Sequence, residues 1–386
     1  MKTRATQKNR IILIRNGHQF IHTNIKLIQA AKKFILLHTY IFTEDEVTTP
    51  IINALSEAAD RGVQVYILLD AFGSSDFPAQ TVEKLKAHGV KFSFFTPLIN
   101  LKKIGRRLHQ KMLIIDNKIA LTGGINLSQE FNNKYKPWLD FSCCIEGEEV
   151  HHLYQQSLQL YLSHFPLSKT ELLGFNELKH LANDNVLVKT NVNDFFKNNQ
   201  DIFTSYIKAI STARDEIIIL ATYFIPGKLM LNELKKAANR GVEIKLIFGK
   251  VSDQPLASIA EKYLYEWYIK NNIQIYEWGD SIIHGKLALI DSKWVTIGSY
   301  NHNYISRYGN LELNLEVFNK SFAKIVKNEF NMILSRSKKI QLDDFEFSTK
   351  SRLLSFLVYK LTNLITFLSI ILLFRKSSES TDKLLK

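Results

Sequence analysis

Two stretches of this chain decide its fold, and they read His109-Gln110-Lys111-Met112-Leu113-Ile114-Ile115-Asp116 and His284-Gly285-Lys286-Leu287-Ala288-Leu289-Ile290-Asp291. Ten residues after each aspartate comes an asparagine, in Gly123-Gly124-Ile125-Asn126 and in Gly298-Ser299-Tyr300-Asn301. A single such string can arise by accident at the edge of a strand. Two copies with the same downstream spacing indicate an internal repeat.

The repeat extends beyond these motifs. The segment Ala59-Asp60-Arg61-Gly62-Val63 is echoed by Ala238-Asn239-Arg240-Gly241-Val242, with an offset of 241 − 62 = 179 against 284 − 109 = 175 for the histidines. In each half we expect the order helix, strand, helix and strand. The repeated segment ends the second helix and begins the second strand. This alternation predicts α/β architecture, with sheets that helices cover.

The motif residues have the chemical character of a phosphate site. Residues two apart on a strand point to the same side, so we expect His109 and Lys111 to face one pocket, as His284 and Lys286 do. A phosphodiester requires cationic donors for its oxygens, a nucleophile, and an acid for the leaving alcohol. Two lysines, two asparagines and two imidazoles supply that set without a metal ion. The glycines before each asparagine suit a tight turn close to an anion.

Over roughly residues 11–335 the sequence resembles the phospholipase D superfamily, and within it the bacterial cardiolipin synthases. Besides the paired motifs, the resemblance is carried by Tyr40-Ile41-Phe42, Tyr223-Phe224-Ile225-Pro226, Trp138-Leu139-Asp140 and Asn310-Leu311-Glu312. It implies two phospholipase D-type repeats, each a mixed β-sheet flanked by helices, packed as a pseudo-twofold pair. We place the first half at residues 1–165, a linker at 166–185, the second half at 186–345 and a C-terminal segment at 346–386.

The resemblance also implies a two-step phosphatidyl transfer. One histidine becomes a phosphohistidine, and the other protonates the departing alcohol and deprotonates the incoming one. We assign His109 as the nucleophile and His284 as the acid and base. The catalytic motif residues are His109, Lys111 and Asp116 in the first half and His284, Lys286 and Asp291 in the second. Lys111, Lys286, Asn126 and Asn301 would bind the phosphate.

Two further carboxylates are assigned from the resemblance, in which a downstream acid orients each histidine. Asp140 lies 31 residues after His109, and Glu312 lies 28 residues after His284. They would fix the imidazole tautomer and stabilise the imidazolium. We interpret the motif aspartates, Asp116 and Asp291, as structural partners that do not face the phosphate.

Composition limits the partners and cofactors. The 386 residues include 50 basic and 37 acidic side chains, and the formal net charge of +13 favours polyanions such as nucleic acid or an anionic membrane surface. The only cysteines, Cys143 and Cys144, form no disulfide framework, and no Cys/His cluster has zinc-ligand spacing. We therefore expect no metal and no cofactor. The resemblance favours a phospholipid, phosphatidylglycerol or similar, and a membrane surface over nucleic acid; no oligomeric state is assigned.

The C-terminal stretch Leu353–Phe374 is almost wholly apolar, with Lys360 near its start. A spanning helix needs about 20 apolar residues, so a span, an interfacial helix and a buried helix on the body all stay open. The N-terminal run Ile11–Ile14 is too short for a signal peptide. We predict a location at the cytoplasmic face of the cell membrane, peripheral or anchored by the apolar segment.

Three functions are compatible with these features. The preferred one is a cardiolipin synthase-like phosphatidyltransferase that uses phosphatidylglycerol or another phospholipid donor. The alternative is a phosphodiesterase of the same superfamily, a phospholipase or nuclease, which fits the positive charge but leaves the apolar C-terminal stretch unexplained. A non-enzymatic membrane-binding protein on the same scaffold is disfavoured by the two intact motifs.

Overall fold

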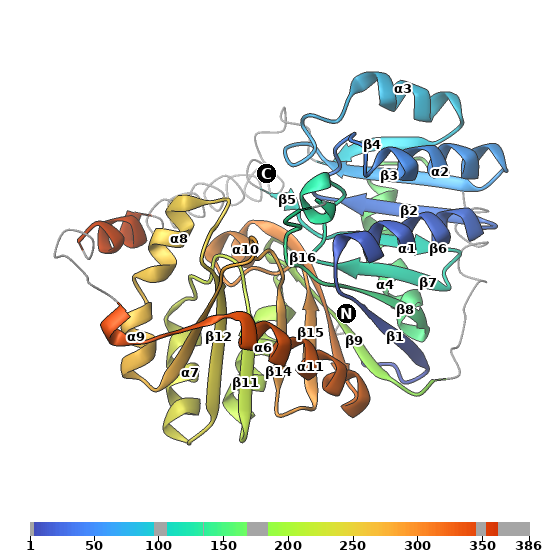
Figure 1. Cartoon of the computed structure of the whole chain (residues 1–386). Coiled ribbons are helices and arrows are strands. Elements are labelled where there is room, and N and C mark those ends of the chain that lie inside the picture. Colours follow the sequence, from blue (N-terminus) through green and yellow to red (C-terminus); the bar gives the residue numbers. More distant parts are fainter. Residues whose placement is uncertain (1–3, 96–105, 134, 168–183, 345–352, 362–386) are drawn as a thin grey trace, which may run out of the picture.

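The computed structural model describes residues 4–95, 106–133, 135–167, 184–344 and 353–361 (Figure 1). Within them the first half forms a seven-stranded sheet in the order β1-β8-β7-β6-β2-β3-β4. β2, β3 and β4 run parallel, and the other neighbours are antiparallel. The bounds are β1 Asn9–Ile14, β2 Phe34–Thr39, β3 Gln64–Asp70, β4 Lys91–Phe95, β6 Met112–Ile115, β7 Ile119–Gly123 and β8 Ser142–Gly147.

The second sheet has the order β10-β9-β16-β15-β14-β11-β12-β13-β17 within the described residues, and a short strand of the first half, β5 Arg107–Leu108, pairs with its β16. The bounds are β9 Leu187–Asp194, β10 Asn199–Gln200, β11 Glu216–Leu220, β12 Glu243–Gly249, β13 Ile273–Trp278, β14 Leu287–Ile290, β15 Trp294–Gly298, β16 Asn310–Phe318 and β17 Lys338–Ile340.

The two sheets repeat one topology. Reading from β9 to β13, the second sheet has β9, β16, β15, β14, β11, β12 and β13 in the places of β1, β8, β7, β6, β2, β3 and β4. The strand that follows each motif lysine is β6 or β14. Its β-hairpin partner, β7 or β15, lies on one side, and the first parallel strand, β2 or β11, lies on the other. The predicted α/β fold of two mixed sheets flanked by helices is confirmed.

Helices cover the outer faces and also lie between the sheets. Within the described residues they are α1 Gly17–Ala30, α2 Thr49–Asp60, α3 Ala79–Ala87, α4 Glu148–Leu162, α6 Asp201–Thr212, α7 Lys228–Asn239, α8 Pro255–Lys262, α9 Tyr265–Lys270, α10 Tyr304–Tyr308, α11 Lys320–Arg336 and a further helical segment at 353–361. Short 3-10 turns are η2 Gln129–Asn132, η3 Phe195–Lys197 and η4 Leu342–Asp344. Helices α1 and α2 pack on the outer face of the first sheet, and α6 and α7 on that of the second.

The repeated Arg-Gly pair has a structural reason. Gly62 and Gly241 follow the ends of α2 and α7 with φ +87°, a left-handed conformation that favours glycine at a helix C-terminus. The preceding arginines reach the neighbouring helix. Arg61 Nη2 donates to terminal carbonyls of α1 (3.2 Å each), and Arg240 Nη2 donates to carbonyls at the end of α6 (3.0 and 3.2 Å). The tripeptide therefore ends one helix and caps the adjacent one in both halves.

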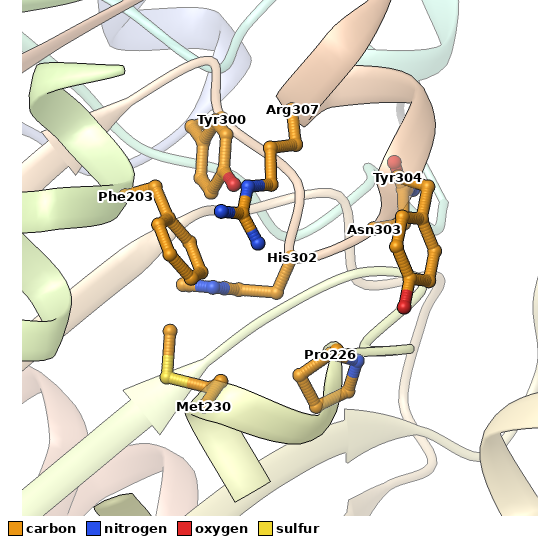
Figure 2. A pocket seen from close by; sticks show the side chains of 9 residues that line it. Phe203, Pro226, Met230, Tyr300, His302, Asn303, Tyr304 and Arg307 are labelled. Carbon is orange, nitrogen blue, oxygen red and sulfur yellow. The ribbon is translucent and has the colours of Figure 1, made fainter. Parts of the chain in front are cut away.

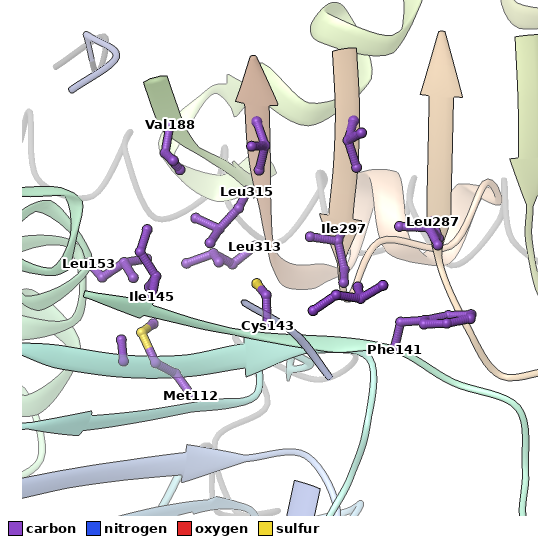
Figure 3. Close-up of a cluster of buried hydrophobic side chains, with 14 of the residues drawn as sticks. Met112, Phe141, Cys143, Ile145, Leu153, Val188, Leu287, Ile297, Leu313 and Leu315 are labelled. Atoms are coloured by element: carbon purple, nitrogen blue, oxygen red, sulfur yellow. The ribbon is translucent and has the colours of Figure 1, made fainter. Parts of the chain in front are cut away.

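The inner faces of the two sheets share one apolar core. Side chains of the first half, such as Met112, Cys143 and Ile145, meet Ile297 and Leu315 of the second (Figure 3). Helices α4 and α11 contribute to the same cluster. Because burial of apolar surface stabilises the fold in proportion to its area, the two halves hold each other in place.

The predicted membrane localisation is wrong on this structure. Within the described residues, no helix combines the length and apolarity needed to cross a membrane. Of the predicted apolar segment, residues 353–361 form a helix. The Tyr359 ring of this segment packs on Tyr263, with 4.9 Å between the ring centres. Residues 345–352 and 362–386 lie outside the described residues, as do residues 168–183 of the proposed linker.

Candidate active site

Each motif histidine is held by backbone of the other half. Strand β5, directly before His109, pairs in parallel with β16, and the His109 amide donates to the Leu311 carbonyl (3.0 Å). On the other side of the site, Leu139 pairs in parallel with Ile283, and the His284 amide donates to the Leu139 carbonyl (2.9 Å). The carbonyl that anchors each histidine thus belongs to the residue directly before a carboxylate of the opposite half.

The two carboxylates cross between the halves as a result. His109 Nδ1 lies 2.8 Å from Glu312 Oε2, and His284 Nδ1 lies 2.6 Å from Asp140 Oδ2. The sequence offsets had matched Asp140 to His109 and Glu312 to His284, and the structure pairs them the other way. The physical reason is the parallel pairing across the interface, which brings each histidine segment beside the strand that enters from the other half.

The two carboxylates have different surroundings. Glu312 is fully buried and also accepts from Ser299 Oγ (2.5 Å) and Asn310 Nδ2 (3.0 Å). Asp140 is fully buried and accepts from the Phe141 amide (2.6 Å). At the place of Ser299, the first half has Gly124, where an added Cβ would lie 2.2 Å from Asp140 Oδ1. Gly124 of the first motif therefore leaves room for Asp140, whereas Ser299 of the second motif donates to Glu312.

The motif lysines lie in the same buried site. Lys111 Nζ donates to the His109 carbonyl (2.6 Å). Lys286 Nζ contacts the His284 carbonyl and lies 3.1 Å from the Nδ1 atom of the same histidine. Burial lowers the pKa of Lys111 to about 7 and that of Lys286 to about 8. The charge of Lys286 also lowers the pKa of Lys111, so charges from both halves meet in one site. Because an anion would favour the charged form of each lysine, phosphate binding and lysine protonation reinforce one another.

Burial also determines the state of the imidazoles. It lowers the pKa of His109, against the opposing charge of Glu312, and lowers that of His284 to about 4, with the charge of Lys286 acting in the same direction. Burial alone would raise the pKa of Glu312, but the charge of His109, its hydrogen bond and nearby Lys111 bring that pKa below its ordinary value. Near neutral pH the free site therefore holds neutral imidazoles whose Nδ1–H donates to a carboxylate, which leaves Nε2 as the basic nitrogen.

The two motif asparagines are buried beside the site. Asn126 Oδ1 accepts from the Ile41 amide (3.3 Å), which ties it to the segment after β2. Asn301 Oδ1 is buried without a hydrogen-bond partner among the described residues. A buried polar atom of this kind costs free energy unless a ligand or water satisfies it. Asn301 therefore has unused hydrogen-bonding capacity at the predicted phosphate site.

The motif aspartates lie at the opposite end of their strands from the lysines. Asp116 accepts from the amides of Lys32, Lys33 and Phe34 (2.8–2.9 Å), just before and at the start of β2. Asp291 accepts in the same way from the amides of residues 214, 215 and 216, at the start of β11. These contacts fix strand starts and place neither carboxylate beside a motif histidine.

Sequence reasoning missed several neighbours of the histidines. Asp70, at the end of β3, accepts from the Leu108 amide (2.7 Å) and so holds the residue before His109. No motif marks this aspartate, and the second half has Gly249 at the corresponding strand end. Aromatic rings also enclose the site. They are Tyr40 against His109 (4.9 Å between ring centres) and Phe131 and Trp138 against His284 (5.2 and 5.8 Å).

No group of three or more His, Cys, Asp or Glu side chains that could hold a metal ion occurs among the described residues. The acid–base equipment of the site is instead two buried imidazole–carboxylate pairs and two lysines, contributed symmetrically by two repeats. Imidazoles and lysines of this kind can serve as nucleophile, acid and cationic donors, the groups that an enzyme for group transfer on phosphate esters requires.

Comparison with known proteins gives the family. The model for the "Cardiolipin synthase, PLD-like domain" family matches residues 24–161 and 206–334, one match in each half. Cardiolipin synthase B of Escherichia coli (strain K12) is 34% identical over 348 residues, which cover 87% of this chain and 83% of that protein. Cardiolipin synthase of Clostridium perfringens (strain 13 / Type A) is 30% identical over 357 residues, covering 88% and 74%. The chain belongs to the cardiolipin synthase family of phospholipase D-like proteins, and it is a phospholipase D-type phosphatidyltransferase.

Solved structures share the fold at low identity. Phosphatidylserine synthase of Haemophilus influenzae Rd KW20 superposes with a TM-score of 0.72 at 16% identity and covers 94% of this chain and 96% of that one. Polyphosphate kinase of Porphyromonas gingivalis reaches 0.60 at 15% identity, covering 92% of this chain and 53% of that one. These similarities establish the two-repeat fold alone.

Proposed function

We propose that this chain is a cardiolipin synthase-like enzyme that transfers a phosphatidyl group from phosphatidylglycerol, or another phospholipid donor, to the hydroxyl of a second phosphatidylglycerol. The observation that carries the proposal is the pair of buried histidines, each with Nδ1 bonded to a carboxylate of the other half. The curated relatives that cover most of the chain are named cardiolipin synthases, which supports the choice of lipid.

In the first step His109 Nε2 attacks the donor phosphorus. The N–P bond forms as the bond from phosphorus to the headgroup oxygen breaks, and His284 gives a proton to the leaving alcohol. Glu312 stabilises the charge that develops on the His109 ring, because its carboxylate accepts from Nδ1 at 2.8 Å. The product of this step is a phosphohistidine that carries the phosphatidyl group.

In the second step the acceptor alcohol attacks the same phosphorus. His284 takes the proton of that hydroxyl, the new O–P bond forms, and the N–P bond to His109 breaks. His284 must be protonated before the first step, although its pKa in the free site is about 4 because of burial and of Lys286. An anionic diester beside Lys286 offsets the positive charge and favours the imidazolium. Substrate binding thus favours the protonated form of His284, which the first step requires.

The phosphate oxygens are bound by the lysines and asparagines of both motifs. Lys111 and Lys286 supply positive charge where the transition state gains negative charge, in a site that burial isolates from water. Asn301 would donate to a phosphate oxygen through its amide N–H, and its Oδ1, which has no partner among the described residues, can accept from an alcohol hydroxyl. No step requires a metal ion, so the reaction should proceed in the presence of a chelator.

The proposal is tested by lipid analysis of purified protein incubated with phosphatidylglycerol vesicles and a chelator. Mass spectrometry should detect cardiolipin with wild-type enzyme and none with His109→Ala. His88→Ala is the matched control, since His88 is exposed and pairs with Asp60 away from the site (2.8 Å). Phosphatidic acid as the sole product would indicate a phospholipase instead. If folded wild-type enzyme forms no lipid product, both the transferase and the phospholipase are excluded.

The phosphohistidine is tested separately, by rapid quenching and peptide mapping at alkaline pH. A phosphatidyl adduct on the peptide that contains His109 supports the assignment of the nucleophile. An adduct on the peptide that contains His284 reverses the roles of the two rings. An enzyme that turns over without any adduct contradicts the two-step reaction.

A further inference from the structure

A hollow in the second half lies behind the loop that carries Asn301. It is lined by Phe203 of α6, Met230 of α7 and, among others, Tyr300, His302 and Arg307, and Figure 2 shows these side chains converging on it. Its volume is about 10 Å³, which is room for one hydroxyl or one water. The hollow opens to solvent at a mouth beside Arg307.

Arg307 places positive charge at this mouth. Its guanidinium carbon lies over the Phe203 ring, 3.5 Å from the ring centre, and Nε donates to Gln200 Oε1 (2.9 Å). Among the described residues it has no carboxylate partner, and its two terminal nitrogens have no acceptor. Stacking and the Gln200 bond fix the guanidinium in one orientation. The N–H donors of a half-buried guanidinium in a fixed orientation can bind two oxygens of a phosphate or a carboxylate.

His302 supplies a neutral polar group in the hollow. It is 4% exposed, and its Nε2 has no hydrogen-bond partner within the described part of the chain. Aromatic rings surround it, with Tyr206 at 4.3 Å and Phe224 at 5.0 Å between ring centres. Burial lowers its pKa to about 3, so the ring is neutral in the physiological range. A neutral ring nitrogen there can bind a hydroxyl, as donor or acceptor according to the tautomer.

The first half lacks these groups at the corresponding place. Leu127 follows Asn126 as His302 follows Asn301, and the two residues have the same backbone role. The Leu127 carbonyl accepts from the Thr43 amide (3.0 Å), and the His302 carbonyl accepts from the Ile225 amide (3.0 Å). The fold therefore accommodates leucine at this position, and the buried histidine is a feature of the second half alone. Packing does not require it.

The hollow and the catalytic site share two loops. Tyr300 and His302 flank Asn301, while Pro226 follows shortly after Tyr223, the counterpart of the Tyr40 that packs on His109. The charges of Arg307 and Glu312 both act on the pKa of the Tyr300 hydroxyl. The hollow therefore shares the loop of Asn301 with the predicted phosphate site.

We propose that this hollow is the subsite for the headgroup of the acceptor lipid, in which Arg307 binds the acceptor's own phosphate and His302 binds the secondary hydroxyl of its glycerol. The proposal rests on the function proposed above, because it names the second substrate of that reaction. The reacting phosphodiester occupies the motif lysines, so the second phosphate of the product needs a cation of its own. All residues of the subsite belong to the half that carries His284, our assigned base for the acceptor.

The subsite leaves the acceptor's primary hydroxyl free to react. That oxygen forms the bond to phosphorus, its proton goes to His284, and the bond from phosphorus to His109 breaks. With the subsite empty, water can take the place of the alcohol and give phosphatidic acid. Occupation of the subsite therefore determines the ratio of transfer to hydrolysis.

The test uses full-length enzyme, a phosphatidylglycerol donor with deuterated acyl chains, and unlabelled acceptors that mass spectrometry distinguishes. One acceptor is phosphatidylglycerol, and the other carries a propane-1,3-diol headgroup, which lacks only the secondary hydroxyl. The variants are R307Q and H302L, the latter taking the residue that the first half has at this position. R214Q is the control for charge, because Arg214 is exposed and outside the hollow. Thermal melting establishes that each variant is folded.

Wild type and R214Q should prefer the glycerol acceptor by about threefold to tenfold, the usual effect of one hydrogen bond between neutral groups. H302L should lose this preference. R307Q should raise the KM for both acceptors at least about tenfold, as expected for a hydrogen-bonded charge, and should increase the fraction of phosphatidic acid. Folded R307Q and H302L with the acceptor kinetics of R214Q would overturn the proposal.

A binding measurement separates this proposal from the proposed function. Calorimetric titration with glycerol 3-phosphate needs no turnover. Wild type, R214Q, R307Q and H302L all keep the motif lysines, so binding there is common to the four proteins. Weaker binding by R307Q than by R214Q supports the subsite even if wild type makes no cardiolipin, in which case only the proposed function fails. Equal binding by R307Q and R214Q overturns it. So does inorganic phosphate binding as tightly as glycerol 3-phosphate with no effect of H302L, since that defines a free-anion site.

Discussion

Glu312→Gln replaces one oxygen of a fully buried carboxylate that accepts three hydrogen bonds, from His109 Nδ1 (2.8 Å), Ser299 Oγ (2.5 Å) and Asn310 Nδ2 (3.0 Å). A hydrogen bond to a charged group contributes about 1.5–3 kcal/mol, against about 0.5–1.5 kcal/mol between neutral groups. Only the bond to His109 strengthens as the ring gains charge in the transition state, and for this one bond the difference is about 1–1.5 kcal/mol. This corresponds to a loss of about tenfold in kcat/KM, measured as the initial rate of cardiolipin formation.

The pH dependence gives the direction of the electrostatic effect. The charge of Glu312 raises the pKa of His109 against burial, so removing that charge lowers this pKa further. In our assignment His109 must be neutral to attack, and its titration forms the acidic limb of the kcat/KM profile. That limb should move to lower pH in E312Q. In Asp140→Asn the basic limb, which His284 sets as the acid, should move to lower pH for the same reason.

The same strand offers the control. Glu316 lies four residues further along β16, is also buried, and contacts Ser205 and Trp294 but neither motif histidine. Glu316→Gln should keep the wild-type pH profile. A wild-type kcat/KM in folded E312Q, or an acidic limb that moves to higher pH, would refute the reasoning. A shift confined to the basic limb in E312Q would exchange the roles of the two histidines.

Three further outcomes follow from the geometry. Gly124→Ala places a Cβ 2.2 Å from Asp140 Oδ1 and should abolish activity, whereas Gly279→Ala meets its nearest neighbour at 3.9 Å and should be neutral; initial rates compare them. Asp116→Asn weakens three contacts to backbone amides and should lower the free energy of unfolding by about 2 kcal/mol, measured in urea, while folded enzyme keeps its kcat. Because the motif lysines have pKa values of about 7 and about 8 and bind anions only when protonated, the inhibition constant of sulfate, a dianion throughout, should rise at least about tenfold from pH 6 to pH 9; a constant value would contradict this.

Much of the fold and half of the site chemistry could be predicted from short repeats. The histidine motifs predict two halves because the motif and its downstream spacing recur at nearly the same offset as the Arg-Gly pairs, and the structure has β6 and β14 in matching places. The Arg-Gly pairs mark helix ends because only glycine adopts a φ of +87° without strain. Both features depend on local backbone geometry, which neighbouring residues in the sequence determine.

The remaining features depend on contacts between the halves. Sequence distance favoured Asp140 as the partner of His109, but the parallel pairing of Leu139 with Ile283 brings Asp140 to His284. Asp70 acts on the His109 segment through a backbone amide 38 residues away, a contact that no motif records. No motif singles out His302, whose Nε2 is buried without a hydrogen-bond partner among the described residues, a feature that only the structure shows.

The exchange of carboxylates between the halves has a consequence for the newly made chain. While the ribosome is still synthesising the second repeat, the first repeat holds a histidine whose acid, Glu312, does not yet exist, and an acid, Asp140, with no ring to serve. Neither imidazole has its carboxylate until both sheets have docked. In the proposed reaction, reactivity toward phosphate esters would therefore be a property of the assembled chain. Two separately expressed halves should regain activity only on mixing.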